Sequence, residues 1–333
     1  MAAAVERALA QGETLIVEAG TGTGKTFAYL VPALLSGLRV VISTGTRHLQ
    51  DQLFHRDLPG VRSALGVPVR AALLKGRSNY LCHHRLELAC GEGCAGREAA
   101  QLQSIRDWSG RTRSGDVAEL TGIPEDAPIW PRVTSTVDNC LGQQCEYLQE
   151  CHINRARREA QDADLVVINH HLLCADLVLR EEGFGELLPG ADAFIIDEAH
   201  QLPETASRFF GVSLSSRQLQ ELAQDSATEY LRAGGELEGL PHTAATLERA
   251  LQDLRLAMGR AEQRAPWSRL AGEPEVGRKV AELEESLARL GAALETEAPR
   301  SRGLDNCHQR AQRLQGLLQQ LTGPTPAGQV HWF

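Results

Sequence analysis

The sequence is poor in lysine, in aromatic residues and in long apolar runs. Only Lys25, Lys75 and Lys279 are lysines, so arginine supplies nearly all of the positive charge, and aromatic residues make up 5% of the chain. No stretch approaches the roughly 20 consecutive apolar residues of a membrane-spanning helix. The N-terminal segment 1–10 has neither the basic start nor the apolar stretch of a secretory signal. These absences exclude an integral membrane protein and a small secreted fold held by disulfides, and they favour a cytoplasmic protein.

The composition is that of a folded protein with unevenly distributed charge. A length of 333 residues suggests two domains, and 42% hydrophobic with 23% charged residues supports a packed core. The net charge of −9 by itself argues against binding to nucleic acid. Residues 1–90, however, carry ten basic and six acidic residues, a local charge of +4. An acidic protein of this kind can still line one groove with basic groups.

Five short runs rich in Val, Ile and Leu predict buried β-strands. They lack strict alternation, as expected when both faces of a sheet are covered. A helical stretch at 26–36 separates the first two, which indicates a parallel α/β sheet. The predicted strands are Thr14–Val17, Val40–Ser43, Val67–Leu74, Leu165–Asn169 and Phe194–Asp197.

The strand pattern is interrupted by a long insertion and is followed by a helical region. Residues 80–158 hold six of the eight cysteines, and after residue 210 apolar residues recur at heptad spacing. We expect residues 1–79 and 159–209 to form the α/β part, 80–158 an inserted subdomain, and 210–333 a bundle with antiparallel final helices. The last two apolar seams are Val276, Val280, Leu283, Leu287, Leu290 and Leu294, then Leu304, Cys307, Ala311, Leu314, Leu318 and Leu321.

A glycine-rich segment between the first strand and the first helix fits a P-loop, with alanine in place of its first glycine. Glycines allow backbone N–H groups to surround phosphate oxygens, and the helix N-terminus adds its positive dipole end. Lys25 would reach the β- and γ-phosphates, and the Thr26 hydroxyl would ligate Mg²⁺. The predicted nucleotide-binding residues are Ala19, Gly20, Thr21, Gly22, Thr23, Gly24, Lys25 and Thr26.

Acidic residues follow the last predicted strand, where the second half of such a site is expected. Asp197 would hold Mg²⁺, and Glu198 would orient or deprotonate the attacking water. His200 is the candidate for coupling nucleotide to nucleic acid. With Lys25, these three residues form the predicted catalytic set.

The cysteines indicate an inorganic group, because a reducing compartment disfavours disulfides. Four thiolates suit zinc or an iron–sulfur cluster, and the loose spacing of one distant cysteine and a trio fits a cluster better than paired zinc knuckles. Cys90 and Cys94 form a nearby pair. Cys174 and Cys307 fall on apolar seams and are expected in the core.

Taken together, these segments resemble the superfamily 2 DNA helicases of the XPD/DinG group, closest to its bacterial YoaA-like branch. The resemblance extends over essentially the whole chain. It rests on the segments Glu18–Thr26, Ser43–Thr46, Leu49–Leu53, Lys75–Cys82, Val167–Leu172 and Asp197–His200, together with the cysteines.

The resemblance implies a RecA-like first motor domain, incomplete here, with an inserted cluster subdomain and a helical arch. It implies ATP and Mg²⁺, and a [4Fe–4S] cluster on Cys82, Cys140, Cys145 and Cys151. It further implies a monomeric 5′–3′ helicase that acts on single-stranded and forked DNA in repair or the damage response, without membrane association. The expected DNA contacts are Ser43, Thr44, Thr46 and Arg47.

The group also has elements that this sequence does not show, namely an adenine-recognising glutamine before Met1 and a second RecA-like domain after Phe333. We therefore expect a fragment that binds nucleotide weakly and hydrolyses it poorly, because that second domain supplies arginine fingers. Two alternatives remain at this stage. One is a zinc-containing P-loop NTPase that does not act on nucleic acid, and the other is a non-catalytic DNA-binding module.

Overall fold

The computed structural model describes the chain except for residues 21, 92–95, 182–186, 237–238, 260–264 and 327–328. The described residues form two compact units. The first comprises Met1–Cys82, Ile105–Thr134 and Gln149–Gly211, and the second comprises His83–Ser104, Ser135–Leu148 and Val212–Phe333. The insertion expected at 80–158 is therefore shared between the two units.

The first unit is built on a parallel sheet of four strands, in the order β2-β3-β1-β4. These strands are β1 Val40–Thr44, β2 Ala71–Leu73, β3 Leu165–Asn169 and β4 Ala193–Ile196. β1 and β3 are buried along their whole length, which explains their unbroken apolar runs. The predicted α/β class with a parallel sheet is confirmed.

The prediction of a strand at 14–17 is wrong, because the described structure has no strand there. The segment belongs to no helix or strand and pairs with no described strand, and Ile16 is 94% exposed. A β-branched apolar run becomes a strand only when a neighbouring strand satisfies its backbone. In the sheet as described, β4 has a partner only on the side of β1.

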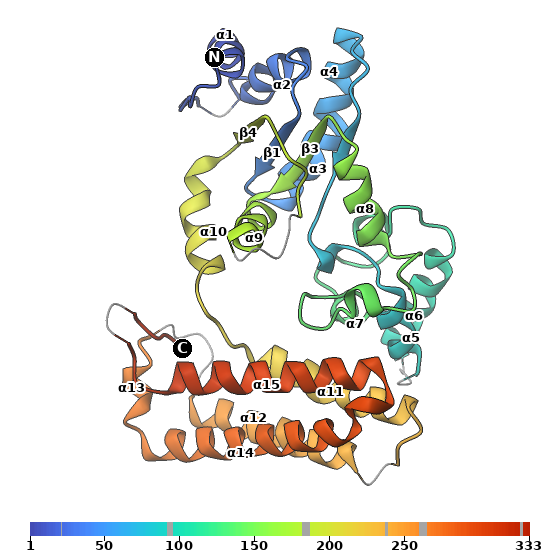
Figure 1. Cartoon of the computed structure of the whole chain (residues 1–333), viewed down its shortest axis with the longest axis vertical. Coiled ribbons are helices and arrows are strands. Elements are labelled where there is room, and N and C mark those ends of the chain that lie inside the picture. Colours follow the sequence, from blue (N-terminus) through green and yellow to red (C-terminus); the bar gives the residue numbers. More distant parts are fainter. Residues whose placement is uncertain (21, 92–95, 182–186, 237–238, 260–264, 327–328) are drawn as a thin grey trace. The chain divides into compact units, whose positions relative to one another are not determined.

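Helices cover both faces of the sheet. Val40 and Ile42 pack with Leu30 of α2 and Val61 of α4, whereas Val41 of the same strand packs on the opposite face with Ile153 of α8. The helices of this unit, of which α6 continues from the second unit, are α1 Ala2–Gln11, α2 Lys25–Leu35, α3 Arg47–Gln52, α4 Leu58–Leu65, α6 Gly96–Ser109, α7 Trp130–Val133, α8 His152–Gln161, α9 His170–Glu181 and α10 Leu202–Phe209. Figure 1 shows β1, β3 and β4 side by side among these helices.

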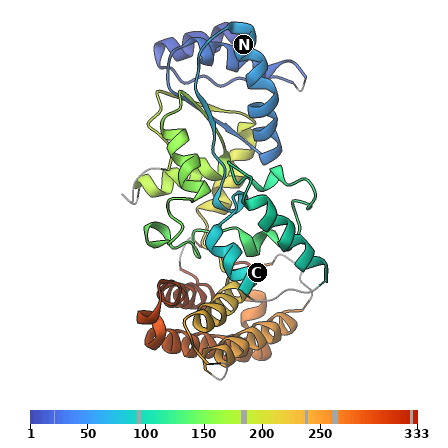
Figure 2. The ribbon, with the colours of Figure 1, turned by 90° about the vertical axis from the view of Figure 1, so that its right-hand side faces the viewer.

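The second unit is a helical bundle joined by a helix of the insertion. Helices α11, α12, α14 and α15 lie side by side in Figure 2. The expected seams are buried, from Val276 to Leu294 in α14 and from Leu304 to Leu318 in α15, and a short turn at Ala298–Arg300 makes these helices antiparallel. The bounds of this unit's remaining helices are α5 His83–Gly91, α11 Ser216–Arg232, α12 Leu240–Ala257, α13 Ser268–Ala271, α14 Pro274–Glu297 and α15 Arg302–Thr322.

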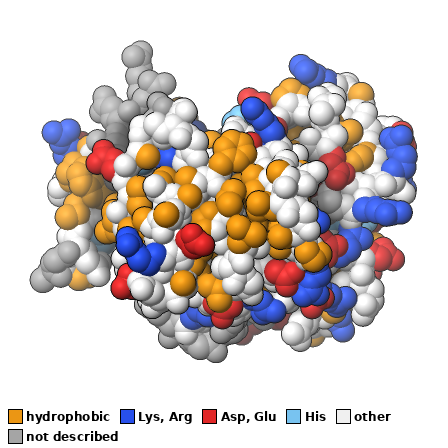
Figure 3. All heavy atoms as spheres, turned by 90° about the horizontal axis from the view of Figure 1, so that it is seen from above, with side chains coloured by type: hydrophobic (Ala, Val, Ile, Leu, Met, Phe, Trp, Pro, Cys, Tyr) orange, Lys and Arg blue, Asp and Glu red, His pale blue; other side chains and the backbone are white. Residues whose placement is uncertain are grey.

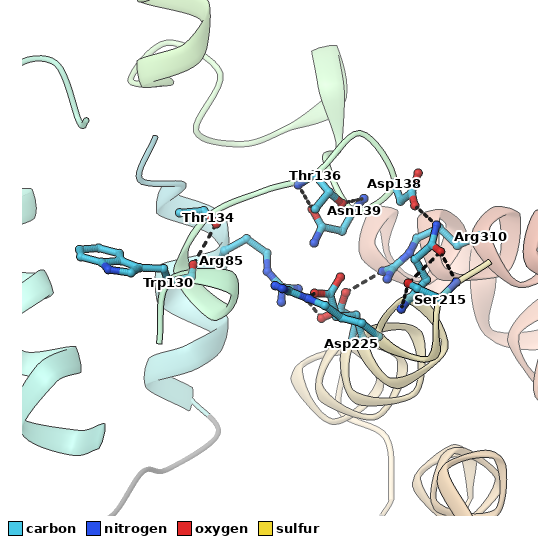
Figure 4. A network of polar contacts seen from close by, with 12 residues as sticks. Arg85, Trp130, Thr134, Thr136, Asp138, Asn139, Ser215, Asp225 and Arg310 are labelled. Atoms are coloured by element: carbon cyan, nitrogen blue, oxygen red, sulfur yellow. Dashed lines mark hydrogen bonds and ion pairs between the residues drawn. The ribbon is translucent and has the colours of Figure 1, made fainter. Parts of the chain in front are cut away.

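A buried charge network ties α5 to the bundle. Asp225 of α11 is 4% exposed, and it accepts hydrogen bonds from Arg85 of α5 and, at 2.6 Å, from Arg310 of α15. His84 Nε2 of α5 lies 3.0 Å from Glu229 Oε1 of α11. Figure 4 shows the side chains of Arg85 and Arg310 meeting at Asp225. Three helices that are distant in sequence are thus held by one carboxylate.

Candidate active site

The glycine-rich loop lies directly before α2 and is open to solvent. Gly22 and Gly24 have φ angles of 75° and 82°, in the left-handed region that favours glycine. Gly24 is the N-cap of α2, and Thr23 Oγ1 donates a hydrogen bond to the carbonyl of Gly20 at 2.8 Å. Thr21 lies outside the described residues. The loop therefore curls at the positive end of an eleven-residue helix, where phosphate groups bind readily.

The catalytic residues predicted from distant parts of the sequence meet at this loop. Lys25 Nζ donates a hydrogen bond to Glu198 Oε1 at 2.9 Å, and both side chains are about a quarter exposed. This hydrogen bond raises the pKa of Lys25, and the nearby charges of Glu198 and Asp197 act in the same direction. The amine is thus held as a cation beside two carboxylates, at the place where phosphate oxygens would otherwise balance its charge.

Asp197 faces α2 through a buried tyrosine. Tyr29 Oη donates a hydrogen bond to Asp197 Oδ2 at 3.2 Å, and the Thr26 hydroxyl also contacts Tyr29. Burial raises the pKa of Tyr29, and the negative charge of Asp197 raises it further, so the phenol stays protonated. Thr26 and Ala19 are half-buried. A hydroxyl and a carboxylate oxygen therefore flank one tyrosine, and both are oxygen ligands of the kind that Mg²⁺ prefers.

Glu198 has an unusual backbone conformation. Among the described residues it is the one non-glycine residue with a positive φ angle, 54°. Such a conformation costs about 1–3 kcal/mol and is often found at functional sites. The preceding residue, Asp197, is anchored because its N–H donates to the carbonyl of Ser43 at 2.8 Å. His200 Nδ1 lies 3.3 Å from Glu198 Oε2, on a side chain that is 71% exposed.

The predicted DNA-contacting turn divides into a buried half and an exposed half. Ser43 and Thr44 are each 1% exposed at the end of β1, and their hydroxyls bond within the protein. Their side chains therefore do not offer a contact to a strand in this structure. Thr46 and Arg47 are exposed, and Thr46 Oγ1 caps α3 by accepting a hydrogen bond from the N–H of Leu49 at 3.2 Å. Of the four predicted DNA-contacting residues, Thr46 and Arg47 are therefore the two with exposed side chains.

Three residues near the site, Tyr29, His170 and Gln201, were given no individual role in the sequence-based prediction. Tyr29 and His170 touch predicted site residues, and a Cβ added to Gly45 would lie 2.2 Å from Gln201 Oε1. His170 directly follows β3, and Gln201 directly follows the acidic segment. Polar residues just after buried parallel strands gather at the carboxyl edge of a sheet, and this position was the available signal.

The four predicted cluster cysteines are all half-buried. Cys82 and Cys151 belong to the first compact unit, and Cys140 and Cys145 belong to the second. Among the described residues no group of three or more His, Cys, Asp or Glu side chains is gathered as a metal site. The donor set nevertheless fits the group in its chemistry, because four thiols are the ligands of iron–sulfur clusters. The cluster assignment stays a prediction.

Two of the other cysteines of the sequence analysis lie in the core. Cys174 and Cys307 are each 1% exposed in the core, as expected, and burial raises the pKa of Cys307 to about 12. Cys90 is half-buried, and Cys94 lies outside the described residues. The helices that the structure describes include none both long and apolar enough to cross a membrane.

A parallel α/β sheet, a glycine-rich loop at a helix N-terminus and strand-end carboxylates facing that loop define a P-loop nucleotide-binding domain. Comparison with known proteins makes this class more specific. Residues 2–80 match the family described as DEAD/DEAH box helicase. This match agrees with the resemblance to the helicases of the XPD/DinG group that the sequence indicated.

Relatives that match the chain are named as helicases and are about twice as long or longer. Over its whole length the chain is 44% identical to the ATP-dependent DNA helicase YoaA of Escherichia coli (strain K12) and 43% identical to that of Haemophilus influenzae. It spans 53% and 52% of those two proteins, about half their length. Over 77% of the chain it is 35% identical to the ATP-dependent helicase DinG of Mycobacterium tuberculosis, of which it covers 41%.

Proposed function

We propose that the chain is the nucleotide-binding motor part of an ATP-dependent DNA helicase. The whole protein would move 5′ to 3′ along single-stranded DNA and unwind forked duplexes, in DNA repair or the response to damage. The observation that carries the proposal is the hydrogen-bonded ion pair between Lys25 of the P-loop helix and Glu198 of the acidic segment. It joins the phosphate-binding and water-activating groups in one site. The helicase activity named for the relatives supports the proposal.

In this proposal each group has its own step. The N-terminus of α2 and its glycine loop bind the phosphates, and Lys25 exchanges its contact with Glu198 for the β- and γ-phosphate oxygens. The released Glu198 carboxylate then orients the attacking water and accepts its proton. Asp197 and Thr26 are the residues that would hold Mg²⁺, which neutralises charge on the β- and γ-phosphates when bound with ATP.

Two substitutions test this assignment. Glu198→Gln should keep nucleotide binding and lower the rate of ATP hydrolysis about 10²- to 10⁴-fold, because a positioned base contributes that much. Lys25→Ala should weaken nucleotide binding about 10- to 100-fold, as expected for a lost charge-assisted contact. Binding is measured with a fluorescent ATP analogue, and hydrolysis by phosphate release with and without a single-stranded oligonucleotide.

Matched controls come from the bundle. Lys279→Ala and Glu275→Gln remove the same charges from α14 and should leave both measurements unchanged. The assignment is wrong if Lys25→Ala binds the analogue as tightly as the unsubstituted chain, or if Glu198→Gln hydrolyses ATP at the original rate.

The cofactor part of the proposal has its own test. Protein purified without oxygen should contain iron and acid-labile sulfide and show a visible absorbance band. Cys145→Ser should lose most of the iron and the band, whereas Cys90→Ser, outside the predicted ligand set, should keep both. Stoichiometric zinc in place of iron would instead support the zinc-containing P-loop NTPase.

A further inference from the structure

His170 is a buried histidine at the end of β3, behind the acidic segment of the candidate nucleotide site. It directly follows β3, is 0% exposed, and its Nδ1 lies 2.7 Å from Ser43 Oγ at the end of β1. Because Ser43 pairs in register with Ile168, His170 stands two residues beyond that pair, at the carboxyl edge of the sheet. An apolar side chain would fill this place without burying two polar ring nitrogens. The polar contact therefore calls for an explanation other than packing.

The other side of the imidazole ring faces the acidic segment. The backbone of Glu198 and Asp197 lies within hydrogen-bonding reach of the ring, whose Nε2 is buried. Ser43 is held at two points, since its carbonyl accepts from the N–H of Asp197 at 2.8 Å and its hydroxyl bonds His170. One serine thus connects the end of β1 to the start of the acidic segment, both directly and through the ring.

Both ends of this connection carry function in the proposed helicase. On one side, the turn after Ser43 continues to the exposed Thr46 and Arg47. On the other side, the segment continues into Glu198, whose left-handed backbone aims its carboxylate at Lys25. A small displacement of the exposed turn therefore changes the support of the strained residue. Packed polar contacts of this kind transmit displacement between discrete arrangements.

We infer that His170 is a positioning residue that couples the exposed turn after β1 to the Glu198 backbone, so that binding of single-stranded DNA and binding of nucleotide depend on each other. The inference rests on the proposed function, because it needs a strand at the turn and a nucleotide at Lys25. By linkage, each ligand must change the affinity for the other by the same factor. This coupling factor separates a positioning role from a purely structural one.

The coupling factor can be measured on the chain without any hydrolysis. The dissociation constant of a non-hydrolysable ATP analogue is determined with and without a saturating single-stranded oligonucleotide, for the unsubstituted chain, His170→Leu, Ser43→Ala and the double variant. The unsubstituted chain should show a factor of about 5–150, the usual range for coupled sites. Each single variant should bring it close to 1, and the double variant should lower it no further, because both remove one connection.

Two further variants keep the test decisive if His170→Leu does not fold. His170→Asn places an amide near the position of Nδ1, so it keeps a partner for Ser43 but loses the ring beside Glu198, and it should also lose the coupling. His171→Asn is the matched control, because His171 is exposed on the same helix, and it should keep the full factor. Amide hydrogen exchange should increase together at 43–46 and 197–201 in His170→Asn and at neither segment in His171→Asn.

The outcomes separate the inference from the proposed function. A chain that binds neither the analogue nor the oligonucleotide contradicts the proposed function and the inference with it. A chain that binds both, with the same coupling factor in His170→Asn, Ser43→Ala and the original sequence, overturns the inference alone. Variants that lower the melting temperature but keep the coupling factor show a purely structural histidine and also overturn it.

Discussion

At the scale of single residues, Lys75 shows how charge is buried next to the site. Its side chain is 2% exposed, and its Nζ lies 2.6 Å from Asp51 Oδ1 and 2.7 Å from Asp116 Oδ2. Its backbone N–H donates to Tyr80 Oη at 3.0 Å. Asp51 is on α3, which follows the exposed turn, and Asp116 belongs to the insertion. One ammonium group therefore connects the end of β2 with two segments distant in sequence.

Removing this ammonium group should be costly. Lys75→Ala leaves two carboxylates close together without their cation, and we expect a loss of about 3 kcal/mol in the free energy of unfolding, since breaking a buried ion pair typically costs 3–5. Asp51 retains some access to water, which places the value at the low end. Lys279→Ala, whose lysine pairs with exposed carboxylates of the bundle, should lower the free energy of unfolding much less. Denaturant unfolding measures the free energy of unfolding of both variants. Equal losses of this free energy in the two variants would contradict the prediction.

Residue types and spacing predict which side chains meet at the site better than they predict exposure. The meeting of Lys25 with Glu198 could be expected from the sequence, because the proposed phosphate binding and water activation need those groups in that context. The burial of Ser43 and Thr44 could not be assigned. Whether the end of a strand faces solvent depends on its neighbours, and β1 lies between β3 and β4, which the sequence alone does not reveal.

At the scale of elements, the spacing of apolar residues predicted helices correctly but predicted strands less well. The heptad seams of α14 and α15 are buried as expected, because a helix satisfies its backbone internally and only its apolar face needs a neighbour. Strands depend on pairing. The run 67–74 forms a strand only at Ala71–Leu73, where β3 provides a partner, and 14–17 forms none. Apolar character predicts a strand's existence only together with a partner.

In the bundle, the contact between helices that should contribute most to stability is the Asp225 carboxylate, which three helices share. Asp225→Ala leaves Arg85 and Arg310 buried without their common acceptor, and we expect the unfolding free energy to fall by about 3–5 kcal/mol. The control is Asp253→Ala on α12, whose half-exposed carboxylate pairs with Lys279 and should be worth about 1 kcal/mol or less. Thermal and urea unfolding measure both. A loss at Asp225 no larger than at Asp253 would show that the network adds little to the bundle.

At the scale of the whole molecule, the two compact units do not follow the simplest division of the sequence. The insertion contributes 80–82, 105–134 and 149–158 to the first unit and 83–104 and 135–148 to the second. A contiguous cysteine- and arginine-rich segment suggested one subdomain, but composition does not report which neighbour buries a segment. Trp108 and Trp130 of this segment are 7% and 4% exposed and so are packing residues. Stacking on bases requires exposed rings, which these two do not offer.

The surface of the first unit carries apolar side chains that should limit its solubility. Ile16 is 94% exposed and Phe194, on β4, is 49% exposed, and β4 lacks a partner on one side among the described strands. Figure 3 shows hydrophobic side chains gathered on one face of the molecule. Open strand edges and apolar patches promote association between chains. We expect the double substitution Ile16→Ser and Phe194→Ser to lower light scattering by concentrated protein without lowering its melting temperature.

The control is Leu256→Ser, which removes a side chain that is 80% exposed on α12 and should leave the scattering unchanged. If Leu256→Ser lowers the scattering as much as the double variant does, general surface hydrophobicity drives the association and the strand edge does not.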